Sequence, residues 1–164
     1  MHVHNYEKLW LGLSMLLIVA LIGAVTYGAV GAGVAMVDDS HETVDPDNLG
    51  DHPRFGDTGV HHVEGNQYDV NVLAVQFAFL PTTIEVPAGS EVTFYITSPD
   101  VLHGFQLEGT NVNTMVIPGE VAEITVEFDE PAEYGVVCNE FCGQGHHDME
   151  GLLTVVPEDE YDND

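Results

Sequence analysis

The chain has 164 residues, and its charged side chains are almost all acidic: 28 Asp and Glu against 2 Lys and Arg, for a formal net charge of −26. Such a charge repels phosphate backbones, which excludes nucleic-acid binding. Because 45% of the residues are hydrophobic and only 18% are charged, the chain is not a disordered acidic tail, and its length allows one domain of roughly 100 to 125 residues plus an appendage.

The first expected element is an apolar run over residues 9–37 that contains no charged side chain. At about 1.5 Å per residue this run exceeds the roughly 30 Å of bilayer hydrocarbon, whereas the apolar core of a signal peptide has only about 7 to 15 residues. We therefore predict a retained transmembrane helix. A cleavable signal peptide is the alternative, because small residues at 31–35 resemble a processing site. Lys8 beside the run predicts that residues 1–8 lie in the cytoplasm and that everything after Val37 lies outside the cell membrane.

Residues 38–66 are acidic, contain Gly and Pro, and show no apolar periodicity. This composition predicts an exposed linker. The segment also contains His41, His52, His61 and His62. We interpret them as a scattered, solvated set, with a zinc site as the less favoured alternative.

From residue 67 to 157 the pattern is all-β. Alternating apolar and polar residues are separated by turn signals rich in Pro, Gly and Asp, and short strands at this spacing predict a β-sandwich or barrel. The strongest strand patterns lie at 69–79, 91–97, 121–128 and 151–156. Residues 158–164 form an acidic tail. The predicted fold is a membrane-anchored β-sandwich.

Four candidate metal ligands lie within a dozen residues: Cys138, Cys142, His146 and Met149. A second imidazole is available upstream at His103, and we expect the five side chains to converge from two loops. Thiolate and thioether ligands are soft and favour copper over magnesium, calcium or manganese. A structural zinc site has no use for a methionine. The residue types therefore predict a copper site.

The number of thiols decides the kind of copper site. A mononuclear blue site uses one Cys, two His and a weak axial Met, but here a second Cys follows four residues after the first. Two thiolates can bridge two metal ions and leave one imidazole and one weaker ligand for each ion. We therefore predict a dinuclear copper centre that relays electrons. A mononuclear site and a Cys138–Cys142 disulfide are the alternatives; the disulfide would close a very small loop and leave His146 and Met149 without a role.

The motif Cys-x3-Cys-Gly-x2-His-x2-Met, with its upstream histidine, resembles the copper loop of subunit II of the haem–copper terminal oxidases. The resemblance covers about 75–156, and the phrases at 98–105 and 108–113 are similar to the ba-type (B-family) enzymes, which commonly carry one subunit II helix. It implies an all-β, cupredoxin-like Greek-key β-sandwich with one N-terminal transmembrane α-helix, and a dinuclear CuA centre of two copper ions. The ligands that it implies are His103, Cys138, Glu140 through its backbone carbonyl, Cys142, His146 and Met149. Some relatives also bind magnesium through the Glu side chain; we do not predict this for Glu140.

The resemblance implies a function as well. The chain would accept electrons from a soluble donor, cytochrome c or a small blue copper protein, and pass them to haem in subunit I, where oxygen is reduced to water. The span 9–37 contains no histidine that could bind haem, so oxygen chemistry would belong to subunit I. A free-standing, membrane-anchored copper carrier or copper-delivery module is the alternative.

Four other side chains near these motifs need an interpretation. We expect His147 to face solvent, because it cannot easily point at the same metal as its neighbour. Phe77 and Phe79 are interpreted as core residues of a strand, with aromatic cover near the copper as the alternative. The sequence leaves open whether Asp100 tunes the imidazole of His103.

The acidity also needs an explanation. A patch that steers a basic donor should be local, but 27 of the 28 carboxylates follow the apolar run and are spread through every later segment. Diffuse acidity with almost no Lys indicates adaptation to molar salt, where screening acts over about 3 Å. We therefore predict a halophilic protein whose electrostatic docking is weak.

Overall fold

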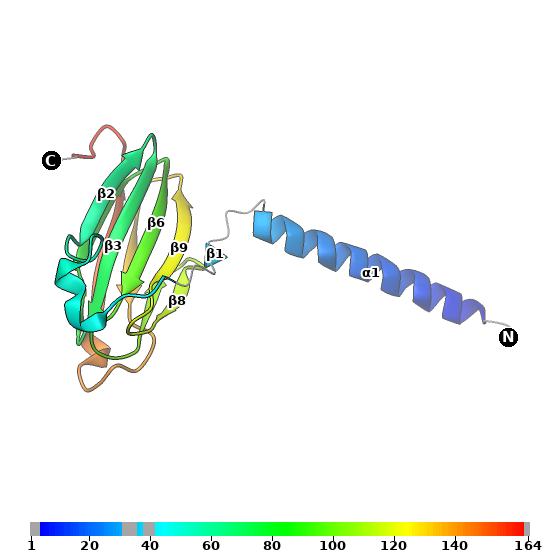
Figure 1. The fold of residues 1–164 in the computed structure, drawn as a ribbon. Helices are drawn as coiled ribbons and strands as arrows, with labels where there is room; N and C mark the ends of the chain where they lie inside the picture. Colours follow the sequence, from blue (N-terminus) through cyan, green and yellow to red (C-terminus); the bar gives the residue numbers. More distant parts are fainter. Residues whose placement is uncertain (1–3, 31–35, 38–41, 163–164) are drawn as a thin grey trace. The chain divides into compact units, whose positions relative to one another are not determined.

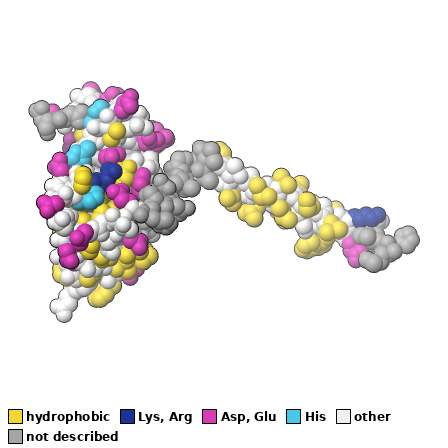
Figure 2. Space-filling model, viewed as in Figure 1, with side chains coloured by type: hydrophobic (Ala, Val, Ile, Leu, Met, Phe, Trp, Pro, Cys, Tyr) yellow, Lys and Arg dark blue, Asp and Glu magenta, His cyan; other side chains and the backbone are white. Residues whose placement is uncertain are grey.

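The computed structural model describes residues 4–30, 36–37 and 42–162 and divides the chain into two compact units, Met1–Val34 and Ala35–Asp164. The first unit contains α1 (Asn5–Val30), which is long and apolar enough to cross a membrane by length and composition. Its hydrophobic side chains are exposed along its length (Figure 2). At its start, the His4 N–H donates to the Glu7 carboxylate at 2.8 Å, which satisfies one backbone donor that a helix leaves free.

The helix bounds differ from the predicted run over 9–37. The helix begins earlier and ends at Val30, and Met36–Val37 form a short strand, β1. β1 pairs with the strand β9 (Ala122–Phe128) of the second unit. Residues 31–35 lie outside the described part of the chain. An apolar run cannot mark this boundary, because apolar residues suit a membrane helix and a strand equally well.

The second unit is a sandwich of two sheets (Figure 1). Both sheets mix antiparallel pairs with one parallel pair. The parallel pair is β3 (Gln67–Val75) with β6 (Ser90–Thr97) in the first sheet and β5 (Thr83–Pro87) with β11 (Glu150–Val156) in the second. The first sheet has the order β1, β9, β6 (Ser90–Thr97), β3 (Gln67–Val75) and β2 (Gly59–Glu64), with β4 (Ala78–Leu80) paired to β3. The second has the order β5 (Thr83–Pro87), β11 (Glu150–Val156), β10 (Ala132–Val137), β7 (His103–Leu107) and β8 (Asn113–Val116).

The core lies between the two sheets. Along β6 the side chains alternate, and Val92, Phe94 and Ile96 are fully buried. Phe105 of β7 meets them from the opposite sheet, with its ring 5.5 Å from that of Phe94 and 5.6 Å from that of Phe79. Aromatic pairs in such tilted and edge-to-face arrangements add to the stabilisation from burial. The predicted sandwich is confirmed.

Residues 42–66 are folded against the sandwich, whereas the sequence predicted an exposed linker. A short 3₁₀ helix, η1 (Pro46–Asp51), is followed by β2, which pairs with β3. Leu49 and Phe55 are buried together with Val44 and with Val121 of the sandwich. These apolar residues are too widely spaced to show a helical or strand period, which is why the composition suggested a linker.

Candidate metal centre

The candidate ligands meet at one end of the sandwich, where the segment 138–149 (orange in Figure 1) leaves β10 and returns to β11. β7 and β10 are antiparallel, and their last paired residues are Val137 of β10 and Gln106 of β7. The residues of β7 that precede Gln106 therefore run beside the segment that follows Val137. This arrangement brings His103 next to Cys138. We expected His103 on a loop, but it is the first residue of β7 and is completely buried.

The donor atoms form two similar halves around the two sulfurs. Cys138 Sγ lies 3.9 Å from His103 Nδ1 and 3.1 Å from the carbonyl oxygen of Glu140. Cys142 Sγ lies 3.7 Å from His146 Nδ1 and 3.6 Å from Met149 Sδ. Each half thus offers one thiol, one imidazole nitrogen and one weaker donor.

The two sulfurs are 3.9 Å apart, and both cysteines are free. A disulfide has its sulfurs at about 2.05 Å, so the structure does not contain the alternative Cys138–Cys142 bridge. Both cysteines and Met149 are nearly inaccessible, with exposed fractions of 6%, 3% and 3%. Within the described residues, His103, Cys138 and Cys142 form a group compact enough to hold a metal ion. The donor set is soft and buried, and it fits copper.

Burial lowers the acidity of the Cys142 thiol. It raises the pKa of Cys142 to about 11, and the neighbouring Cys138 adds to this effect. The Cys142 thiol would therefore resist ionisation at neutral pH without a cation to stabilise the thiolate. Metal binding at this site should therefore release protons.

Asp100 fixes the orientation of the buried imidazole. Its Oδ1 lies 2.8 Å from His103 Nε2, so Nε2 carries the proton and Nδ1 faces the sulfurs with its lone pair. Burial opposes ionisation of Asp100. Hydrogen bonds from His103, the backbone N–H groups of Gln76 and Val101, and the Ser98 hydroxyl nevertheless hold its pKa below the ordinary value. The question left open by the sequence is answered: Asp100 contacts His103 directly.

Two glycines let the loop lie against the turn between β3 and β4. Gly143 has a φ of +136°, and a Cβ at this position would meet the Phe77 ring at 2.9 Å. A Cβ on Gly145 would lie 2.5 Å from the same ring. The prediction of core packing is confirmed for Phe79, which is 1% exposed, but it is wrong for Phe77, which is 38% exposed and covers the ligand loop.

The outer face of the loop is partly apolar. Phe141 is 72% exposed, and its ring packs edge-on against His146 at 5.8 Å. Figure 2 shows hydrophobic side chains gathered at this end of the domain. His147, in contrast, is exposed and contacts Asp148 at 3.2 Å, as expected for a solvent-facing residue. Of these two adjacent histidines, His146 therefore faces the candidate metal centre and His147 faces solvent.

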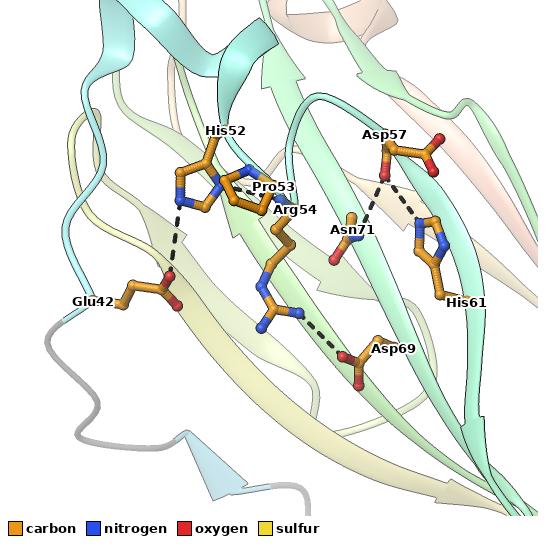
Figure 3. A pocket seen from close by; sticks show the side chains of 8 residues that line it. All are labelled: Glu42, His52, Pro53, Arg54, Asp57, His61, Asp69 and Asn71. Atoms are coloured by element: carbon orange, nitrogen blue, oxygen red, sulfur yellow. Dashed lines mark hydrogen bonds and ion pairs between the residues drawn. The ribbon is translucent and has the colours of Figure 1, made fainter.

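A polar pocket of about 410 Å³ lies elsewhere, where the segment 42–66 covers the first sheet. Figure 3 shows Arg54 joined to Asp69 over this sheet. The Arg54 guanidinium lies 3.1 Å from the Asp69 carboxylate. The guanidinium also stacks over the Tyr95 ring at 3.5 Å. His52 and His61 line the pocket, but in the described part of the chain neither belongs to a group that could hold a metal. His41 lies outside the described residues.

Comparisons with known proteins agree with this geometry. The family model described as cytochrome C oxidase subunit II, periplasmic domain, matches residues 61–156. The chain is 41% identical over 159 residues to cytochrome c oxidase subunit 2 of Thermus thermophilus, covering 92% of this chain and 91% of that relative.

Two solved structures are similar to this chain. A chain in the cryo-EM structure of a heme-copper terminal oxidase dimer matches with a TM-score of 0.67 and 34% identity, covering 93% of this chain and 100% of that one. The periplasmic domain of subunit II of cytochrome oxidase (CoxB) of Bradyrhizobium japonicum matches with a TM-score of 0.54 and 20% identity, covering 60% and 91%. The latter likeness concerns the fold, and it confirms the predicted cupredoxin-like sandwich.

Proposed function

Because the chain belongs to the cytochrome c oxidase subunit II family, we propose that it admits electrons to a terminal oxidase through a dinuclear copper centre. The chain is part of an oxidoreductase complex, and subunit I is its partner. The observation that carries the proposal is the meeting of two free, buried thiols with two imidazoles and a thioether at separations of 3.6 to 3.9 Å.

The residues that would hold the copper pair are His103, Cys138, Glu140 through its backbone carbonyl, Cys142, His146 and Met149. When bound, the copper pair supplies a one-electron redox couple that is delocalised over both ions.

The protein's part is to keep this donor set rigid and dry. His103, Cys138, Cys142 and Met149 are buried, so water is excluded from most of the site. Asp100 holds the His103 ring in one orientation and one tautomer. A site that changes little between its redox states suits electron relay and does not suit catalysis of oxygen reduction.

We assign electron input to the loop surface around His146. This imidazole is only partly buried. Phe141 packs against it, and Phe77 lies against the neighbouring Gly145. An exposed apolar rim around a partly exposed ligand suits brief docking of a soluble donor, either cytochrome c or a small blue copper protein. Docking through apolar contacts should depend little on salt.

The helix supports a single-pass membrane anchor. We propose that residues 1–8 are cytoplasmic, that the apolar segment beginning at residue 9 crosses the membrane, and that the copper domain over 67–157 and the tail over 158–164 lie on the outer face. The apolar window 9–28 contains no histidine, so the haem that receives the electron belongs to subunit I. A free-standing carrier or delivery module is disfavoured, since a relative that matches over 92% of this chain is an oxidase subunit.

We also propose that the protein works in molar salt. Its 28 carboxylates are offset by only 2 basic residues. Of these two, Arg54 is already paired with Asp69. A docking patch for one basic partner would not require acidity in every segment after the helix.

Electron delivery within the assembled complex tests the function. The full-length chain is produced with subunit I in membranes, purified in detergent and mixed rapidly with a reduced donor. The expected result is reduction of copper first and haem afterwards. A complex with Cys142→Ser should keep its haem but lose rapid haem reduction. Haem reduction at the wild-type rate in that variant, or failure of the two subunits to purify together, would contradict the proposal.

A further inference from the structure

Gln76 lies in the turn between β3 and β4, outside the expected ligand set, yet it contacts both segments that supply the ligands. Its backbone N–H donates to Asp100 Oδ2 at 2.7 Å, and its side-chain amide donates to the carbonyl oxygen of Cys142. We propose that Gln76 is a positioning residue that fixes the Cys142 half of the centre relative to the His103 half. The inference rests on the proposed dinuclear copper function and deepens it.

The first connection runs through the backbone. Gln76 N–H holds one oxygen of Asp100, and the other oxygen of the same carboxylate holds His103 Nε2 at 2.8 Å. The turn therefore fixes the carboxylate that orients the buried imidazole. Because this connection uses the backbone N–H, it survives every substitution of residue 76 except proline.

The second connection runs through the side chain. A carbonyl oxygen only accepts hydrogen bonds, so the NH₂ group of Gln76 must face Cys142. The approach is close, because a Cβ on the next residue, Gly143, would lie 2.9 Å from Gln76 Nε2. The ring of Phe77 fills the space beside Gly145 in the same way. The amide thus holds the loop that carries Cys142 and His146 against the turn.

These two connections make residue 76 the junction between the two halves. Hydrogen bonds outside the ligand set orient ligands, and their loss typically lowers metal affinity by 10- to 100-fold. If the side-chain connection is removed, the Cys142 half can shift while Asp100 still holds the His103 half. The two copper ions should then become inequivalent. Gln76 is itself exposed, so its replacement opens no hole in the core.

The test compares Gln76→Leu and Gln76→Glu with a matched control, Gln67→Leu. Gln67 is an exposed glutamine at the start of β3, and its amide donates to Glu91 at 2.9 Å. In the copper-loaded, full-length protein, both Gln76 variants should share the unpaired electron unequally between the two copper nuclei. Their copper affinity, measured by competition with a chelator, should also be roughly 10-fold weaker than that of the wild type. In the copper-free protein, their cysteines should react faster with a thiol reagent. Gln67→Leu should match the wild type in all three measurements.

Equal sharing together with wild-type copper affinity in both Gln76 variants would overturn the inference. The same changes in Gln67→Leu would also overturn it, and so would unfolding of both Gln76 variants, because the side chain would then serve stability alone. If the wild type itself shows no shared electron, the proposed function fails instead, so the two failures can be told apart.

Discussion

Asp100 influences the candidate metal centre through a single imidazole. Its carboxylate accepts a hydrogen bond from the His103 Nε2–H group at 2.8 Å and accepts others from Ser98, Val101 and Gln76. Asp100→Asn keeps the shape of this side chain but removes the charge that favours a protonated Nε2. We expect copper affinity to fall roughly 10- to 100-fold, measured by competition with a chelator. Asp129→Asn is the control and should have no effect, because Asp129 is exposed and lies between β9 and β10. Equal affinity in the two variants would show that Asp100 does not orient His103.

The adjacent histidines provide a second test at this scale. His146 Nδ1 lies 3.7 Å from Cys142 Sγ, whereas the His147 ring is exposed and contacts Asp148. We expect His146→Ala to abolish the dinuclear copper spectrum and His147→Ala to leave it unchanged, as measured by visible absorption after copper loading. Loss of the spectrum in His147→Ala would contradict the assignment of ligands.

At the scale of elements, the segment 42–66 behaves as part of the sandwich. Phe55 is 2% exposed and packs with Leu49, Val44 and Val121. Phe55→Ala should therefore lower the free energy of unfolding of the copper-free, full-length chain by about 3 kcal/mol, the usual loss for a buried aromatic side chain. Denaturant unfolding in detergent measures the change. Phe141→Ala is the matched control, because that ring is 72% exposed, and it should change stability by less than about 0.5 kcal/mol. If the segment 42–66 were an exposed linker, the two variants would have the same free energy of unfolding.

The sequence predicted some elements better than others for physical reasons. Alternation is long and regular at β6 and β9, and both strands lie where they were expected. β5, β7 and β8 are short and lie among Pro and Gly residues, so no regular period stands out there. Phe55 gave no signal, because a single aromatic residue in an acidic stretch becomes a core residue only through tertiary contacts.

The same distinction holds for the candidate site. The five candidate ligand side chains could be proposed from the sequence, because a copper site needs particular donor atoms and four of these residues lie within a dozen positions of one another. The structure brings them together, with His103 arriving from a strand. Gln76 could not be identified, because an exposed glutamine has no chemical signature. Its importance comes from the two segments that the fold places beside it.

At the scale of the whole molecule, the dominant feature is the net charge of −26. Carboxylates spread over one domain repel each other, and this repulsion weakens as salt shortens the screening length from about 10 Å at 0.1 M to about 3 Å at 1 M. We expect the thermal unfolding temperature of the full-length protein to rise as KCl increases from about 0.1 M to above 1 M. Sucrose at matched osmolarity controls for general exclusion from the surface. Unfolding that is indifferent to KCl would contradict adaptation to high salt.

The most direct test of the central claim is electron paramagnetic resonance of the copper-loaded, full-length chain in detergent. The proposed dinuclear centre predicts a hyperfine pattern from one electron shared equally by two copper nuclei. A pattern from a single copper nucleus would contradict the dinuclear centre. A protein without a copper signal, whose Cys138 and Cys142 are joined by a disulfide, would contradict it as well.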